Sequence, residues 1–91
     1  MKLKKEVLLD HIEMMNSDPY EIADEIETSR GNFTQVLNGT KSLNRDLCGR
    51  LVYVFGSAVM FTAIEWRDEK DRRWFLKKFE DDEGDDYDDE Y

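Results

Sequence analysis

The sequence has few residues of the kinds that build disulfides, metal sites or flexible linkers: one cysteine, one histidine, one proline and five glycines. The single cysteine, Cys48, excludes an internal disulfide and fits a reducing compartment. Its spacing from Val52 and Phe55 indicates a small apolar group on a helix face. The single histidine, His11, belongs to no Ser-His-Asp arrangement or Cys/His cluster, and no phosphate-binding loop is visible. We therefore expect neither an enzyme nor a bound cofactor or metal ion.

Long apolar runs are also missing. No apolar stretch approaches the ~18 residues that a membrane helix needs. The N-terminal stretch MKLKKEVLLD interrupts its apolar residues with charges too closely spaced for a secretory signal. These absences predict a cytoplasmic protein with no membrane partner.

Acidic charge is in excess, and it is concentrated at one end of the chain. The 91 residues include 22 acids and 13 bases, which gives a net charge of −9. Residues 80–91, here called the acidic tail, hold nine of the acids and no base. Residues 1–79 therefore carry 13 charges of each sign and are formally neutral. The length suits one small domain, so we predict a single domain over 1–79 followed by the acidic tail.

Apolar residues at helical spacing predict four helices in the first 56 residues, the first over residues 3–15. Asp18-Pro19 is a strong start signal for the second helix, and Ser29 and Asn44 are expected to cap the next two. Asn38-Gly39 and Gly56 are expected to end the third and fourth helices, because glycine tolerates positive φ. The predicted inward-facing residues are Leu8, Ile12, Met15, Ile22, Ala23, Ile26, Phe33, Val36, Leu37, Leu47, Leu51, Val54 and Phe55.

The segment after Gly56 has a different composition. SAVMFTAIEW is rich in β-branched and aromatic residues and lacks a helical stripe, so residues 58–66 are predicted to form a strand. Residues 69–79 place acids early and bases late, which favours a closing helix; a hairpin strand is the alternative. The expected fold is mainly α: a four-helix helix-turn-helix core, a strand (58–66) and a closing helix or hairpin strand (69–79).

The stretch ADEIETSRGNFTQVLNGTKSLNRDLCGRLVYVFG resembles the helix-turn-helix of the Cro and lambda-repressor family. In that family an alanine faces the turn, a serine opens the recognition helix and Asn-Gly closes it. Ala23, Ser29 and Asn38-Gly39 take those places here, and the resemblance covers residues 19–56. The chain departs from the pattern at Glu27, where the family usually has glycine.

The resemblance implies a small sequence-specific transcriptional regulator, phage- or prophage-like, that binds double-stranded operator DNA through the helix beginning at Ser29. Carried over by position, Arg30 would read guanine, and Asn32 or Gln35 would read adenine. Residues beside the helix would hold phosphates and fix its register. The implied DNA-binding residues are Ser29, Arg30, Asn32, Gln35, Asn38, Lys41 and Arg45.

Two features of the same stretch leave an alternative open. Gly31 lies inside the recognition helix, where glycine costs about 1 kcal/mol relative to alanine. The second helix carries four acids that would lie near a phosphate backbone: Glu21, Asp24, Glu25 and Glu27. A helix-turn-helix kept as a structural core without a role in DNA binding is therefore the alternative interpretation.

The segment AVMFTAIEW resembles the strand that pairs across a dimer in some relatives of this family, including antitoxin regulators. A lone strand leaves its backbone groups unpaired, so a sheet shared between two subunits would satisfy them. We therefore expect a homodimer through residues 58–66, or else an intramolecular hairpin with residues 72–79.

The acidic tail admits three interpretations. Runs of like charge usually remain solvated. Alternatively, the tail folds over the basic strip from Arg30 to Arg50 and competes with DNA. Thirdly, extended carboxylates recurring about every 4 Å approach the ~3.4 Å phosphate spacing of a DNA strand. Such a tail could block the basic nucleic-acid channel of a nuclease or toxin, as an antitoxin or anti-CRISPR protein would. Its partner-binding residues would be Asp81, Asp82, Glu83, Asp85, Asp86, Tyr87, Asp88, Asp89 and Glu90.

Overall fold

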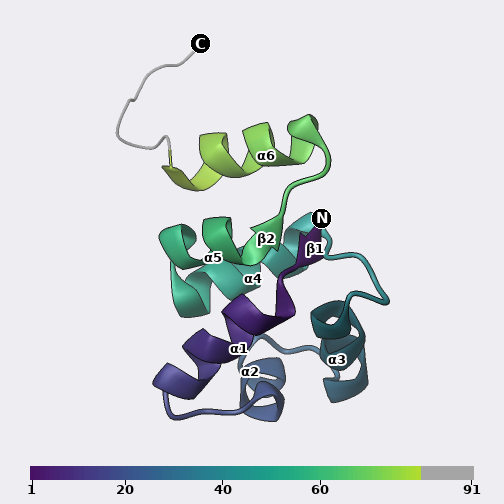
Figure 1. The fold of residues 1–91 in the computed structure, drawn as a ribbon, viewed down its shortest axis with the longest axis vertical. Coiled ribbons are helices and arrows are strands. Elements are labelled where there is room, and N and C mark those ends of the chain that lie inside the picture. The colour runs from purple at the N-terminus through teal and green to yellow at the C-terminus, as the bar shows by residue number, and fades with distance from the viewer. Residues whose placement is uncertain (81–91) are drawn as a thin grey trace.

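The computed structural model describes residues 1–80, which form helices and one very small sheet (Figure 1). The mainly α fold class is therefore confirmed. Residues 81–91, which include the predicted partner-binding acids, lie outside the described residues. The elements in chain order are β1 (Lys2–Leu3), α1 (Lys5–Met14), α2 (Pro19–Glu25), α3 (Arg30–Asn38), α4 (Arg45–Phe55), α5 (Ser57–Ala63), β2 (Ile64–Glu65), α6 (Glu69–Phe75) and the π-helical turn η1 (Leu76–Glu80).

Side-chain caps begin α2, α3 and α4 at the predicted residues. Asp18 Oδ1 accepts a hydrogen bond from the Glu21 N–H at 3.0 Å, with Pro19 at the first helical position. Ser29 Oγ accepts from the Asn32 N–H at 3.0 Å, and Asn44 Oδ1 accepts from the Leu47 N–H at 2.7 Å. Each cap satisfies a backbone donor that the first turn of a helix leaves without a partner.

Three successive helices end in the same backbone motif. Asn16, Glu27 and Gly39 follow α1, α2 and α3 with φ values of 60°, 59° and 83°. In each case the next residue donates its N–H back into the last helical turn, the pattern of a Schellman C-cap. These bonds run from Ser17 to Ile12 (3.1 Å), from Thr28 to Ala23 (3.0 Å) and from Thr40 to Gln35 (3.0 Å). The predicted stop at Gly39 is confirmed.

The core contains most of the predicted inward-facing residues. Those of α2 and α3 are buried, as are Leu8, Ile12, Leu47 and Leu51. The prediction is wrong for Met15, which lies beyond the last turn of α1 and is 47% exposed. Cys48 is fully buried, which confirms that it packs as a small apolar group.

The predicted strand over residues 58–66 is wrong for most of its length. Residues Ser57–Ala63 form α5, which packs against α1 and α4. Met60 and Ala63, three residues apart, are fully buried, so the segment does have an inward helical face. Intrinsic β preference spans only ~1 kcal/mol, and packing overrides it here.

The strand β2 pairs within the chain, antiparallel to β1, with Lys2 opposite Glu65 and Leu3 opposite Ile64. The Lys4 N–H extends this contact by donating to the Ala63 carbonyl at 2.7 Å. The predicted hairpin with residues 72–79 is therefore wrong, and the element predicted to pair across a dimer is largely helical. Because Leu3 belongs to the sheet, α1 begins at Lys5 rather than at residue 3.

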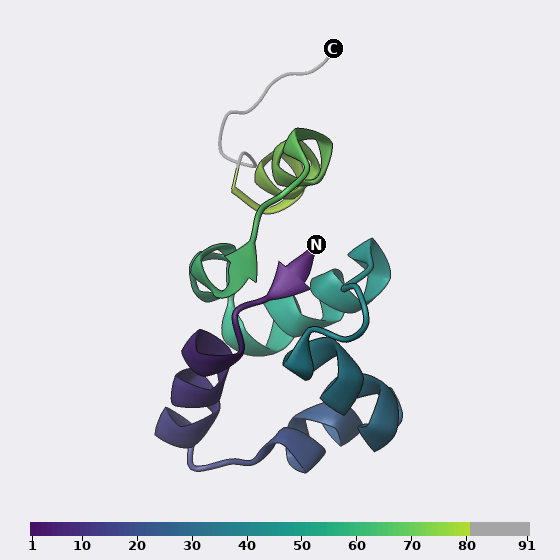
Figure 2. The same ribbon diagram turned by 45° about the vertical axis from the view of Figure 1, so that its right-hand side comes forward.

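The closing element is a helix, as the charge order of residues 69–79 predicted. Helix α6 and turn η1 cover α4 and α5 through five aromatic side chains whose neighbouring ring centroids lie 4.9–6.3 Å apart. These are Phe61, Trp66, Trp74, Phe75 and Phe79. Figures 1 and 2 both place α6 at one end of the 40 Å long axis and α2 at the other.

Candidate nucleic-acid interface

The turn between α2 and α3 is held in place by hydrogen bonds from a side chain of α4. Arg50 Nη1 donates to the carbonyls of Ile26 and Glu27, at 3.0 and 3.3 Å. The same guanidinium forms an ion pair with Asp46 at 3.2 Å. Ile26 is 3% exposed, so the turn is also anchored by an apolar side chain. These contacts fix the orientation of α3 relative to the rest of the domain.

One side of α3 packs into the core and the other side carries the predicted base-reading residues. Phe33, Val36 and Leu37 are buried, whereas Arg30 and Gln35 are exposed. The Gln35 side chain makes no hydrogen bond to any residue in the described part of the chain. Its amide therefore has both a donor and an acceptor to offer.

Arg30 is exposed but already has partners on α2. Its Nη2 lies 3.1 Å from Asp24 Oδ2, and its Cζ lies 5.1 Å from the centre of the Tyr20 ring. The hydrogen bond that Arg30 donates to the Asp24 carboxylate raises the pKa of Arg30. The two charged side chains are 59% and 61% exposed, so their ion pair is weak and exchangeable. A phosphate or guanine would compete with Asp24 for this guanidinium.

Asn32 and Lys41 meet beside the start of α3. Lys41 Nζ donates to Asn32 Oδ1 at 2.5 Å, and Asn32 Nδ2 donates to Thr28 Oγ1 at 2.8 Å. The structure therefore brings a predicted phosphate-binding lysine into contact with a predicted base-reading amide. Asn38 is exposed at the other end of α3, and Ser29 is occupied as the N-cap.

Arg45 is directed away from this group, toward α6. Its Nε and Nη2 donate to Asp71 Oδ1 at 3.3 and 3.2 Å, and its Cζ lies 5.1 Å from the Trp74 ring centre. Asp71 also lies 3.8 Å from the amino group of Met1. Arg45 therefore connects α4 to α6, a role that the resemblance did not suggest.

Sequence reasoning missed Lys2, which the fold brings to the end of α3. Lys2 Nζ donates to the Gly39 carbonyl at 3.0 Å, and the Leu43 N–H donates to the Met1 carbonyl at 2.8 Å. Strand β1 is thus attached to the loop that follows α3. No local signal predicts this contact, because its partners are 37 residues apart in sequence.

Acidic side chains border the same surface on the α2 side. Glu21, Asp24, Glu25 and Glu27 are all exposed, and Glu21 accepts a hydrogen bond from Ser17 Oγ at 2.7 Å. The exposed face of α3 therefore lies between acids on α2 and the cations Lys2 and Lys41. Its electrostatic field is mixed rather than uniformly basic.

The described residues hold no group of three or more His, Cys, Asp or Glu side chains that could bind a metal ion. Within residues 1–80, no helix has the length and apolar character needed to span a bilayer. Comparisons with protein-family models, with curated proteins and with solved structures found no match for this chain.

Proposed function

We propose that this protein is a small DNA-binding regulator that reads double-stranded DNA with α3. The observation that carries the proposal is the outer side of α3, where Arg30 and Gln35 are exposed and Asn32 is half-buried on a helix with a capped start. Arg50 fixes the turn that precedes this helix. A major groove ~12 Å wide admits one α-helix, so a rigidly presented helix end is a suitable reading element.

Each side chain has a role that its chemistry supports. Gln35 offers an amide that has no hydrogen-bond partner among the described residues and could bind adenine in a bidentate pair, and Arg30 could bind guanine once it leaves Asp24. Lys41 and Lys2 lie at the edge of the same surface and would contact phosphates. Asn32 would either read a base or, by holding Lys41, position a phosphate contact.

The test is a selection of binding sites from a random duplex library, followed by fluorescence anisotropy with the selected duplex. The full-length chain is compared with a tail-neutralised variant, in which Asp81, Asp82, Asp85, Asp86, Asp88 and Asp89 are replaced by asparagine. We expect one sequence to be enriched and its affinity to fall steeply between about 50 and 200 mM salt. Absence of DNA affinity at low salt for both proteins would refute the proposal.

A second candidate function is a protein-binding inhibitor whose acidic tail occupies a basic nucleic-acid channel. The observation that favours it is that all six arginines already form ion pairs with acids of the described residues. This pairing reduces the positive field available to DNA. A pull-down from nuclease-treated host lysate separates the two functions, since capture of a nuclease or toxin by the full-length chain but not by the tail-neutralised variant supports only the inhibitor.

A further inference from the structure

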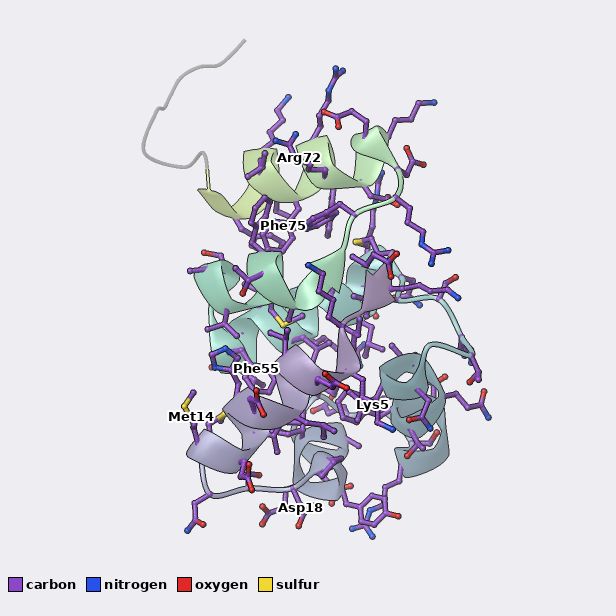
Figure 3. All side chains as sticks on the ribbon, viewed as in Figure 1. Lys5, Met14, Asp18, Phe55, Arg72 and Phe75 are labelled. Atoms are coloured by element: carbon purple, nitrogen blue, oxygen red, sulfur yellow. The ribbon has the colours of Figure 1, made fainter. Side chains whose placement is uncertain are left out.

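The outer face of α6 and η1 carries a stripe of basic side chains. Lys70, Arg73 and Lys77 follow the spacing i, i+3, i+7, which places them on one side of the helix. All three are exposed, whereas Phe75 on the opposite side is fully buried. Figure 3 labels Phe75 on the side of α6 that faces α5, and nitrogen-tipped side chains project from the other side.

The described acids of the same segment do not neutralise the positive charge of this stripe. Asp71 turns inward and accepts hydrogen bonds from Arg45. Glu69 is shared by two arginines, with Oε2 at 3.1 Å from Arg72 and 3.3 Å from Arg73. The lysines of the segment, at positions 70, 77 and 78, form no ion pair with the acids of residues 1–79. The outer face therefore presents Lys70, Arg73 and Lys77, with Lys78 beside them, and of these four bases Arg73 alone is paired with an acid of residues 1–79.

We propose that residues 81–91 of the same chain dock along this basic face. The segment carries eight acids and follows directly after η1. Twelve helical residues from Glu69 to Glu80 span ~18 Å, whereas eleven extended residues reach ~36 Å. The segment is therefore long enough to turn back and cover the whole stripe. A short tether gives an effective concentration in the millimolar range, which favours docking within one chain over docking between copies.

The α6 face suits this segment better than the strip from Arg30 to Arg50. Within that strip, Arg50 is held by the turn carbonyls and Arg45 by Asp71. The α2 end of the molecule, which carries the acids beside Arg30, lies opposite α6 (Figure 1). Docking on α6 would occupy a second basic surface and leave α3 as the accessible face for a polyanion.

The test is a comparison of backbone amide NMR spectra of the full-length chain and the tail-neutralised variant. The amide signals of residues next to the tail will shift whether or not the tail docks on α6. The informative amides are therefore those of Lys70 to Arg73. We expect these amides to differ between the two proteins at low salt and to coincide near 1 M salt, where the Debye length is ~3 Å. A matched variant, Lys70→Gln with Arg73→Gln and Lys77→Gln, should show no such difference when its own tail is neutralised.

Three results would overturn the proposal. Unchanged amides at Lys70 to Arg73 would mean that the segment does not dock on α6. Differences concentrated at residues 29–50 instead would place it on the α3 side. Differences that grow with protein concentration would show docking on a second copy. None of these results depends on whether α3 binds DNA, so the inference and the proposed function fail independently.

Discussion

Asp71 of α6 accepts both of its hydrogen bonds from Arg45 through a single carboxylate oxygen, Oδ1. The other oxygen, Oδ2, lies 3.8 Å from the amino group of Met1. Asp71 is 21% exposed and Arg45 51%, so the pair is partly shielded from solvent. The side chain of Trp74 lies against the guanidinium and adds a cation–π contact. This cluster connects α6 to the start of α4 and to the N-terminal end of the sheet.

Arg45→Ala should lower the free energy of unfolding by about 1 kcal/mol, because it removes a partly shielded ion pair and a cation–π contact. The measurement is urea denaturation followed by tryptophan fluorescence. Arg67→Ala is the matched control, since within the described residues Arg67 pairs only with Glu65, two positions earlier, at 3.0 Å, and both are exposed. We expect a change below about 0.5 kcal/mol for the control. Equal effects of the two substitutions would contradict a connecting role for Arg45.

The turn before α3 contains a residue whose conformation is unfavourable. Glu27 has φ of 59°, in a position where the helix end favours glycine. Glu27→Gly should therefore raise the free energy of unfolding by roughly 0.5–1 kcal/mol. Glu25→Gly removes the same charge two residues earlier, inside α2, and should instead lower it by up to about 1 kcal/mol. The melting temperatures of the two variants should thus shift in opposite directions from that of the wild type. Shifts in the same direction would argue against backbone strain at Glu27.

Helix boundaries could be predicted because their causes are local. The caps at Asp18, Ser29 and Asn44 act within three residues, and Gly39 needs only its own backbone freedom. The segment Ser57–Ala63 could not be predicted in this way, because its helical state depends on burial of Met60 and Ala63 against α1 and α4. Local preference of β-branched residues is weaker than that burial.

The candidate site shows the same division between local and distant causes. The exposure of Arg30 and Gln35 follows from helical spacing, because Phe33, Val36 and Leu37 fix the inward side of α3. The partners of the charged residues do not follow from spacing. Arg45 meets Asp71 across 26 residues and Lys2 meets Gly39 across 37, and only the tertiary fold brings these groups together.

Cys48 should make stability fall at alkaline pH. Burial raises the pKa of its thiol from 9.0 to about 12, so the unfolded chain loses this proton first as pH rises. The stabilisation from the neutral thiol is complete below pH 9 and is lost as pH approaches 12. The difference in unfolding free energy between wild type and Cys48→Ala should therefore shrink above pH 9, by at most ~1.4 kcal/mol per pH unit. A difference that stays constant across this range would exclude a raised thiol pKa.

Substitutions of base-reading residues and of a phosphate-contacting residue should have different effects on DNA binding. Gln35→Ala and Arg30→Ala should each reduce the preference for the selected duplex over random DNA by ~1–3 kcal/mol. Lys41→Ala should weaken binding to both duplexes alike and reduce the salt dependence. The measurement is anisotropy with both duplexes across a salt series, with Arg67→Ala as a control outside α3. Loss of preference in the Lys41 variant with none in the Gln35 variant would reverse the assigned roles.

The effect of neutralising the acidic tail should depend on whether the partner of this protein is DNA or a nuclease or toxin. A body with no net charge has a modest field, and nine additional acids repel DNA at long range. For a DNA-binding regulator, the tail-neutralised variant should therefore bind DNA more tightly, most clearly at low salt. If the tail also covers the basic face of α6, affinity for random DNA should rise more than affinity for the selected duplex.

The control for net charge compares two variants with three fewer acids each. One replaces Asp85, Asp86 and Asp88 with asparagine, and the other replaces Glu6, Asp10 and Glu13 of α1 with their amides. Long-range repulsion alone would raise affinity for random DNA equally in both, because their net charges match. An exposed α6 face would raise it more in the tail variant. If neutralisation leaves DNA binding unchanged but abolishes capture of a nuclease or toxin, the tail is the binding surface and the protein is an inhibitor rather than a regulator.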